Sequence, residues 1–84
     1  MTIEIQATGD CWVKLTADGR TALARLMHAG DKESRQIREA AVIEVGDAGA
    51  FAFTIDGRAG KPLGRAGQVR IVRITADTVA QYLQ

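Results

Sequence analysis

The fold of this chain is decided by the stretch CWVKLTADGR, residues 11–20, in which a strand pattern runs into a turn. Cys11, Val13 and Leu15 share one face of an extended chain, and the residues between them share the other face. The Asp18-Gly19 pair that follows accepts positive φ at low cost and is a strong short signal for a β-hairpin. The stretch therefore predicts a strand with one buried face, a tight turn and an antiparallel partner.

The same pattern continues on both sides of this stretch. Alternating apolar residues mark strands near 3–7, 42–45 and 51–55, and Asp56-Gly57 repeats the turn chemistry. Further strands are expected at 69–74 and at 21–27, the latter with a bulge at Arg25-Leu26, where the alternation breaks. These features predict an all-β fold, a small β-sandwich (Ig-like) or open barrel of about seven short strands. The single cysteine excludes the Cys–Trp–Cys signature of a true immunoglobulin domain.

The segment 31–41 leaves two alternatives open. Its polar side chains tolerate a helix, and Asp31 could cap one. However, Ile37 is the only apolar residue before Ala40, so a helix would have nothing to bury. A short strand near 35–38 is therefore the preferred prediction.

Two segments near the C-terminal end carry further expectations. Residues 58–67 hold three glycines and the only proline, which predicts a loop with Leu63 plugging the end of the module. The extension 75–84 has Val79, Tyr82 and Leu83 at helical spacing, which is compatible with a short helix. About two turns are not stable alone in water, so this tail docks on the sheet, docks on a partner or frays.

Length and composition indicate one β-rich domain, residues 1–84. Hydrophobic residues make up 46% of the chain and charged residues 25%, which is ordinary for a globular domain. A net charge of +1 gives no strong field to attract nucleic acid. The sequence shows no signal peptide and no apolar run long enough to span a membrane. If the native protein is exported or anchored, the element responsible is expected outside this sequence.

No set of residues predicts a catalytic, cofactor-binding or metal site. His28 is the only histidine and has no neighbouring second ligand. Cys11 shares the inward face of its strand, where a thiol behaves as a small hydrophobe. Asp18, Asp47 and Asp56 stand in turns, where carboxylates usually bond to nearby backbone. We therefore expect no enzyme activity and no cofactor.

The candidate functional feature is a surface around Trp12, which lies on the face opposite Cys11. An exposed tryptophan often marks a contact site, although the tail could instead cover it. A run of basic residues without an intervening acidic one either solvates a face or contacts an anionic surface. The candidate interaction surface consists of Trp12, Lys14, Arg58, Lys61, Arg65, Arg70 and Arg73.

An ordered series of short motifs resembles one protein family. The motifs are Asp10-Cys11-Trp12-Val13, Asp18-Gly19-Arg20, Leu26 through Ala29-Gly30, Val42 through Gly46, Ala48-Gly49, Ile55 through Arg58, Leu63-Gly64 and Gly67-Gln68-Val69. In this order they resemble the C-terminal extracytoplasmic domain of RodZ, a bacterial cell-shape protein of the elongation machinery. The resemblance spans about residues 4–74 and leaves the extension 75–84 outside.

The resemblance implies a place in a larger protein. RodZ proteins carry a cytoplasmic helix-turn-helix-like domain that contacts the actin-like filament MreB, then a transmembrane helix, a linker and this β-rich domain. It implies a location at the periplasmic, extracytoplasmic face of the bacterial inner membrane, as part of a single-pass membrane protein. The sequence contains neither the helix-turn-helix nor the membrane helix. Filament and nucleic-acid binding are therefore not carried over, and membrane attachment would come only through the missing helix.

Two functions of different classes remain open at this point. The first is a non-catalytic protein-interaction domain that links the cytoskeletal anchor to cell-wall synthesis. Its partners would be cell-wall synthesis proteins, wall polymer or a second copy of the chain in a homo-oligomer. The alternative is a small ligand- or glycan-binding β-module of an exported protein, which needs a concave aromatic site made from Trp12 and Tyr82.

Overall fold

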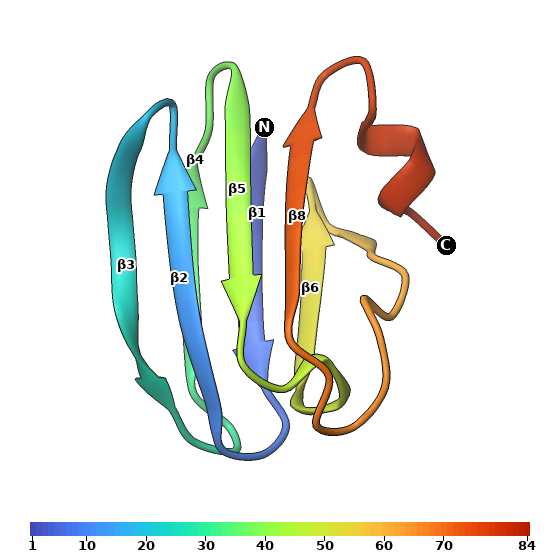
Figure 1. The fold of residues 1–84 in the computed structure, drawn as a ribbon. Helices are drawn as coiled ribbons and strands as arrows, with labels where there is room; N and C mark the ends of the chain where they lie inside the picture. The colour runs from blue at the N-terminus through green and yellow to red at the C-terminus, as the bar shows by residue number, and fades with distance from the viewer.

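The computed structural model describes all residues from 1 to 84 as two four-stranded antiparallel sheets packed face to face (Figure 1). The front sheet has the strand order β3-β2-β5-β8, and the back sheet has the order β4-β1-β6-β7. A short 3₁₀ turn, η1 (Ala48–Ala50), joins β5 to β6. The strands are β1 (Thr2–Ala7), β2 (Cys11–Ala17), β3 (Arg20–Met27), β4 (Lys32–Gln36), β5 (Ala40–Val45), β6 (Phe51–Ile55), β7 (Arg58–Ala59) and β8 (Arg70–Thr75). The prediction of an all-β sandwich is confirmed.

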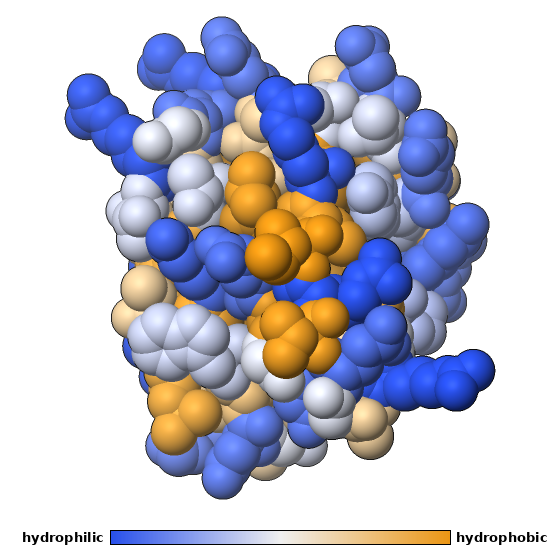
Figure 2. All heavy atoms as spheres, in the orientation of Figure 1, coloured by the Kyte–Doolittle hydropathy of each residue, from blue (hydrophilic) through white to orange (hydrophobic).

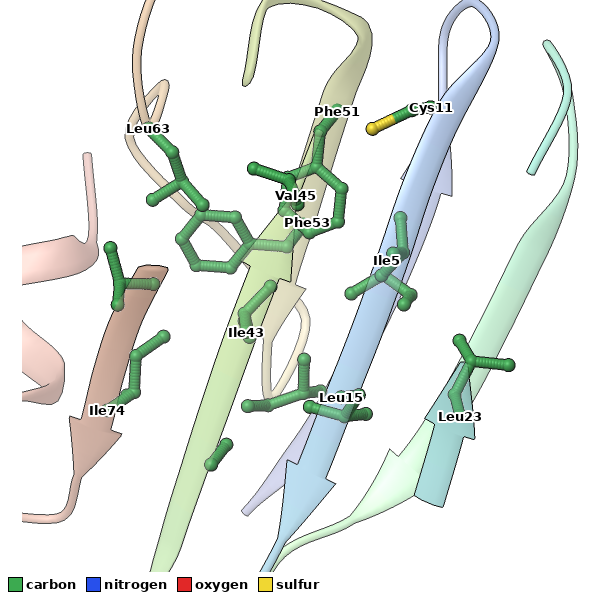
Figure 3. Close-up of a cluster of buried hydrophobic side chains, with 14 of the residues drawn as sticks. Ile5, Cys11, Leu15, Leu23, Ile43, Val45, Phe51, Phe53, Leu63 and Ile74 are labelled. Carbon is green, nitrogen blue, oxygen red and sulfur yellow. The ribbon is translucent and has the colours of Figure 1, made fainter. Parts of the chain in front are cut away.

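The core between the sheets contains 20 buried residues, and all of them are apolar. Figure 3 shows side chains from both sheets meeting in this layer, among them Ile5, Leu15 and Ile43. The inward positions predicted on 11–15, 43–45 and 51–55 are all buried. Because each fully buried Val, Leu, Ile or Phe side chain contributes about 1.5–3 kcal/mol, this layer is the main source of stability.

Two turns have the backbone that their Asp-Gly sequences predict. Asp18 and Gly19 have φ values of 52° and 83°, and Asp56 and Gly57 have values of 50° and 81°. Positive φ at both central residues matches the right-handed twist of the flanking strands. The Asp18 carboxylate also accepts hydrogen bonds from the backbone N–H groups of residues 38, 39 and 40, at 2.9, 2.6 and 3.1 Å. It therefore fixes the distant β4–β5 connection, rather than only its own turn.

The irregularity in β3 lies at a different place from the one expected. Leu15 pairs with Leu23 whereas Thr16 pairs with Thr21, so Ala22 is the extra residue and the bulge predicted at Arg25-Leu26 is wrong. The alternation of apolar and polar residues breaks at Arg25 because this charged residue shares the inward face of β3 with Leu23 and Met27. It can do so because β3 is an edge strand of its sheet. There Arg25 Nη2 lies 3.2 Å from Glu33 Oε2 of β4.

The segment 31–41 forms a strand, but its bounds differ from the prediction near 35–38. β4 spans Lys32–Gln36 and pairs with β1, so that Ile5 faces Glu33 and Ile3 faces Arg35. The core-facing positions of β4 are therefore charged. Arg35 Nη1 and Glu33 Oε1 are 3.0 Å apart, which allows these side chains to neutralise each other at the rim of the core. This pairing is the reason that β4 lacks the apolar alternation typical of a strand.

The C-terminal tail forms a single 3₁₀ turn, η2 (Val79–Tyr82), in place of the short two-turn helix that the spacing allowed. It docks on the back sheet, since Leu83 is buried and forms an isolated bridge with Gly60. Lys61 N–H donates to the Tyr82 carbonyl at 2.7 Å, and Gln84 N–H donates to the Ala59 carbonyl at 3.0 Å. These contacts, together with buried Leu63, cover the side of the sandwich next to β7. No helix has the length and apolarity needed to cross a membrane.

We expect Leu83→Ala to lower the free energy of unfolding by about 2–4 kcal/mol, because it removes a buried side chain and leaves a cavity. Leu26→Ala is the matched control, because Leu26 is half exposed on β3 and its loss should cost under about 1 kcal/mol. Urea denaturation measures both. Equal losses would contradict the docked tail.

A second prediction concerns acid stability. The three backbone N–H donors hold the pKa of Asp18 below its ordinary value of 3.8. The stabilisation by the ionised Asp18 carboxylate is thus complete at pH values above the ordinary pKa of 3.8. It is lost as the pH falls through the lower pKa that this group has in the folded state. Asp18→Asn should flatten the dependence of stability on pH below pH 4, measured by thermal melting. Asp77→Asn, at an exposed position in the tail, should retain the wild-type slope.

Candidate interaction surface

Trp12 lies on the outer face of the front sheet with 49% of its surface exposed. It pairs across the strands with Leu26 of β3, which is exposed to the same extent. The tail does not cover Trp12, because η2 and Leu83 pack beyond β8 and β7, on the other side of the molecule from β3 (Figure 1). The prediction that Trp12 faces away from the core is confirmed, and the covering alternative is wrong.

Four large apolar side chains are exposed in the structure, and all of them belong to the front sheet or its immediate extension. Val69 and Ile71 have exposed fractions of 68% and 63% and continue the outer face onto β8. Figure 2 shows this side of the molecule, where orange apolar atoms gather across the middle among blue polar side chains. We call this set, which consists of Trp12, Leu26, Val69 and Ile71, the front-face patch.

An ion pair crosses the front-face patch between its two ends. Lys14 of β2 lies opposite Glu44 of β5 in the sheet, and Glu44 lies opposite Ile71 of β8. The Lys14 Nζ and Glu44 Oε2 atoms are 3.9 Å apart, and both side chains are more than one third exposed. Such a pair contributes about 0–1 kcal/mol to stability, so its main effect is to cancel charge within the patch.

The structure brings together only part of the predicted basic series. Arg73 lies opposite Val42 on the outer face of β8, beside the row that contains Lys14. Arg70 is on the same strand but on its other face, opposite Val45, and is exposed at the sheet edge. Arg58 belongs to β7 of the back sheet, and Lys61 and Arg65 lie in the loop that leads to β8. None of the five basic residues forms an ion pair.

Sequence reasoning missed Leu26, Val69 and Ile71 as parts of this surface. A signal was present in the last strand, because Ile71 and Val72 are apolar neighbours and must point to opposite faces. In an antiparallel sheet with one face in the core, such a run indicates an exposed apolar side chain.

The other chemically interesting residues do not assemble into a site. The Cys11 thiol is buried and contacts the backbone carbonyls of Asp47 and Trp12, at 3.3 and 3.5 Å. His28 Nδ1 lies 2.9 Å from Asp10 Oδ1 at the exposed end of β3. No group of three or more His, Cys, Asp or Glu side chains is placed to hold a metal ion.

The aromatic site required by the ligand-binding alternative is not assembled either. Trp12 is on β2, two strands away from the β8 edge beyond which Tyr82 lies. The structure has two shallow hollows of about 200 and 290 Å³, on the side of the molecule where Ala52, Gly60 and Gln84 meet. Neither Trp12 nor Tyr82 lines either of them.

Comparison with known proteins identifies one family. The family model described as the RodZ C-terminal domain matches residues 4–75, from β1 to the last residue of β8. The matched segment contains the whole front-face patch and excludes η2. No curated protein and no solved structure gives a significant match.

Two neighbouring substitutions test which side chains of β8 face the core and which face solvent. Ile71→Thr should change the free energy of unfolding by less than about 1 kcal/mol, because this side chain is 63% exposed. Val72→Thr keeps the shape but places a hydroxyl in the core and should cost about 1–3 kcal/mol. Chemical denaturation of both variants measures their free energies of unfolding. A larger loss for Ile71→Thr than for Val72→Thr would mean that Ile71 faces the core and does not belong to the front-face patch.

Proposed function

The chain belongs to the RodZ C-terminal domain family, and from this membership we propose that it is a non-catalytic extracytoplasmic interaction domain of a cell-shape protein. The family is a structural and interaction domain and is not a known enzyme family. The proposed role is to link the cytoskeletal anchor of the elongation machinery to cell-wall synthesis. The domain would act at the periplasmic face of the bacterial inner membrane, held there by a transmembrane helix outside these residues.

The front-face patch is the observation that carries this proposal. Clustered exposed apolar side chains on a folded domain mark contact sites, and tryptophan is among the residues that contribute most to binding energy. The patch lies on the outer face of a sheet, and Trp12 lines neither hollow. An open face fits a protein partner better than a small substrate, which needs a concave site.

The charges around the front-face patch favour a protein partner over nucleic acid. The chain has a net charge of only +1, and Lys14 is paired with Glu44. The unpaired basic side chains are divided between the two sheets and a loop. Nucleic-acid affinity depends on many phosphate contacts from one basic surface, which this arrangement does not supply. The charges thus favour a protein partner, and from the family membership we infer that the partners are cell-wall synthesis proteins, with wall polymer or a second copy as the other outcomes of a binding test.

A triple variant of the front-face patch tests the proposal in cells that make the protein. Trp12→Thr, Leu26→Thr and Ile71→Thr together remove three of its four apolar side chains while keeping residues that favour strands, and only Val69 is left. Cells carrying the variant in the native gene should lose their normal shape because the contact with wall synthesis is weakened. Shape is measured by microscopy, and protein level and melting temperature are measured in parallel.

The matched control replaces three residues on the outer face of the back sheet, with Glu4→Thr, Gln6→Thr and Thr54→Ser. These cells should keep the normal shape. Normal shape in the front-face variant, at normal protein level and stability, would overturn the assignment of this surface.

A further inference from the structure

The four outer strand edges of the two sheets are not protected equally. β7, the short edge strand of the back sheet, is covered by the chain itself, because Leu83 bridges Gly60 and Gln84 N–H donates to the Ala59 carbonyl. The β3 and β4 edges lie on the other side of the sandwich and carry a bridging ion-pair cluster. In it Arg25 contacts Asp31 and Glu33, and Arg35 Nε donates to the Ala22 carbonyl at 3.4 Å. β8 is the remaining edge.

The hydrogen bonds of Thr75 define which backbone groups of β8 are open. Thr75 N–H donates to Thr78 Oγ1 at 2.9 Å, and its carbonyl accepts from Thr78 N–H at 3.1 Å, so both groups point away from β5. In an antiparallel strand every second residue points its N–H and C=O groups to the same side. Ile71 and Arg73 therefore point theirs away from β5 as well, and no hydrogen bond within the chain satisfies them.

The exposed side chains along the β8 edge are apolar or basic. Ile71 is 63% exposed and Val69, just before the strand, is 68% exposed. Arg70 and Arg73 are exposed on the same strand, three residues apart, and neither has an acidic partner. No acidic residue occurs between Arg58 and Arg73. The edge is thus apolar in its middle and positively charged on both sides.

We propose that the β8 edge binds an extended segment of a partner protein as an added antiparallel strand, with acidic side chains opposite Arg70 and Arg73 and an apolar one opposite Ile71. Backbone hydrogen bonds to Ile71 and Arg73 supply affinity, and the alternate side chains supply specificity. This inference rests on the proposed function and names the chemistry of the partner. A second copy of the chain fits less well, because two β8 edges would bring four unpaired arginines together.

A peptide titration tests the proposal on the isotope-labelled chain. The probe is an N-acetylated, C-amidated peptide, Thr-Glu-Thr-Val-Glu-Val-Thr, whose acidic residues are three apart. Its twin has lysine in place of both glutamates. The Ile71 and Arg73 amides should shift and become protected from hydrogen exchange with the acidic peptide. The lysine twin should bind at least ~10-fold more weakly, because it places like charges beside the two arginines.

Two variants separate strand addition from simple charge attraction. Ile71→Pro removes an N–H that faces solvent, so the β5–β8 ladder is retained while binding of the acidic peptide is lost. Ile71→Thr keeps that N–H and should weaken binding far less. The double variant Arg70→Glu and Arg73→Glu should bind the lysine twin in preference to the acidic peptide. This reversal of preference tests the proposal if the Ile71→Pro variant does not fold.

Several results would overturn the proposal. These are unchanged binding by Ile71→Pro, equal binding of the two peptides, or protection of Ile71 and Arg73 that grows with concentration of the chain alone, which would identify a second copy as the occupant. Failure of the proposed function is distinguishable, because it would show as normal cell shape in the front-face triple variant while the peptide still binds β8.

Discussion

The fold depends on an interface between two four-stranded sheets that contains only apolar residues. All 20 buried residues are hydrophobic, and no buried polar side-chain atom is left without a hydrogen-bond partner. A chain of 84 residues has little surface to bury, so it has little stability with which to offset an unpaired polar group in that layer. The strands that form the middle of the two sheets, β1, β2, β5 and β6, therefore each present one apolar face, and the open sides of the sandwich have to be closed by other means.

Those open sides are closed by different interactions. Charged side chains of β3 and β4 meet at one rim, where Arg25, Glu33 and Arg35 neutralise one another. Leu63, Leu83 and the backbone bonds of the tail close the rim next to β7. The Asp18 carboxylate joins the β2–β3 turn to the β4–β5 connection. On β8 the backbone groups of Thr75 are bonded to Thr78, whereas those of Ile71 and Arg73 are left without a partner, and the proposed strand addition rests on these open groups.

The two outer faces differ in a way that bears on function. The back sheet presents polar side chains outward, such as Glu4, Gln6 and Thr54. The front sheet presents Trp12, Leu26 and Ile71. The exposed side chains of Trp12, Leu26 and Ile71 lie outside the buried core, so the packing between the sheets does not require this asymmetry. An apolar outer face lowers solubility without adding to the core, and the proposed contact with a partner would give a physical reason to retain it.

The sequence by itself determined the all-β class, both Asp-Gly turns and the inward residues of β1, β2, β5 and β6, because alternation and turn chemistry are local properties. It also carried the ordered motifs of the family. Only the tertiary structure decided that Arg25, Glu33 and Arg35 occupy inward positions, because Glu33 of β4 is placed against Arg25 of the other sheet as well as against Arg35 of its own strand. The same holds for the tail, whose helical spacing yielded to docking against Gly60, and for the assembly of the front-face patch from β2, β3 and β8. Strand pairing places residues as far apart in the sequence as Trp12 and Ile71 on the same face of one sheet, with β5 between their strands, and no local pattern encodes that arrangement.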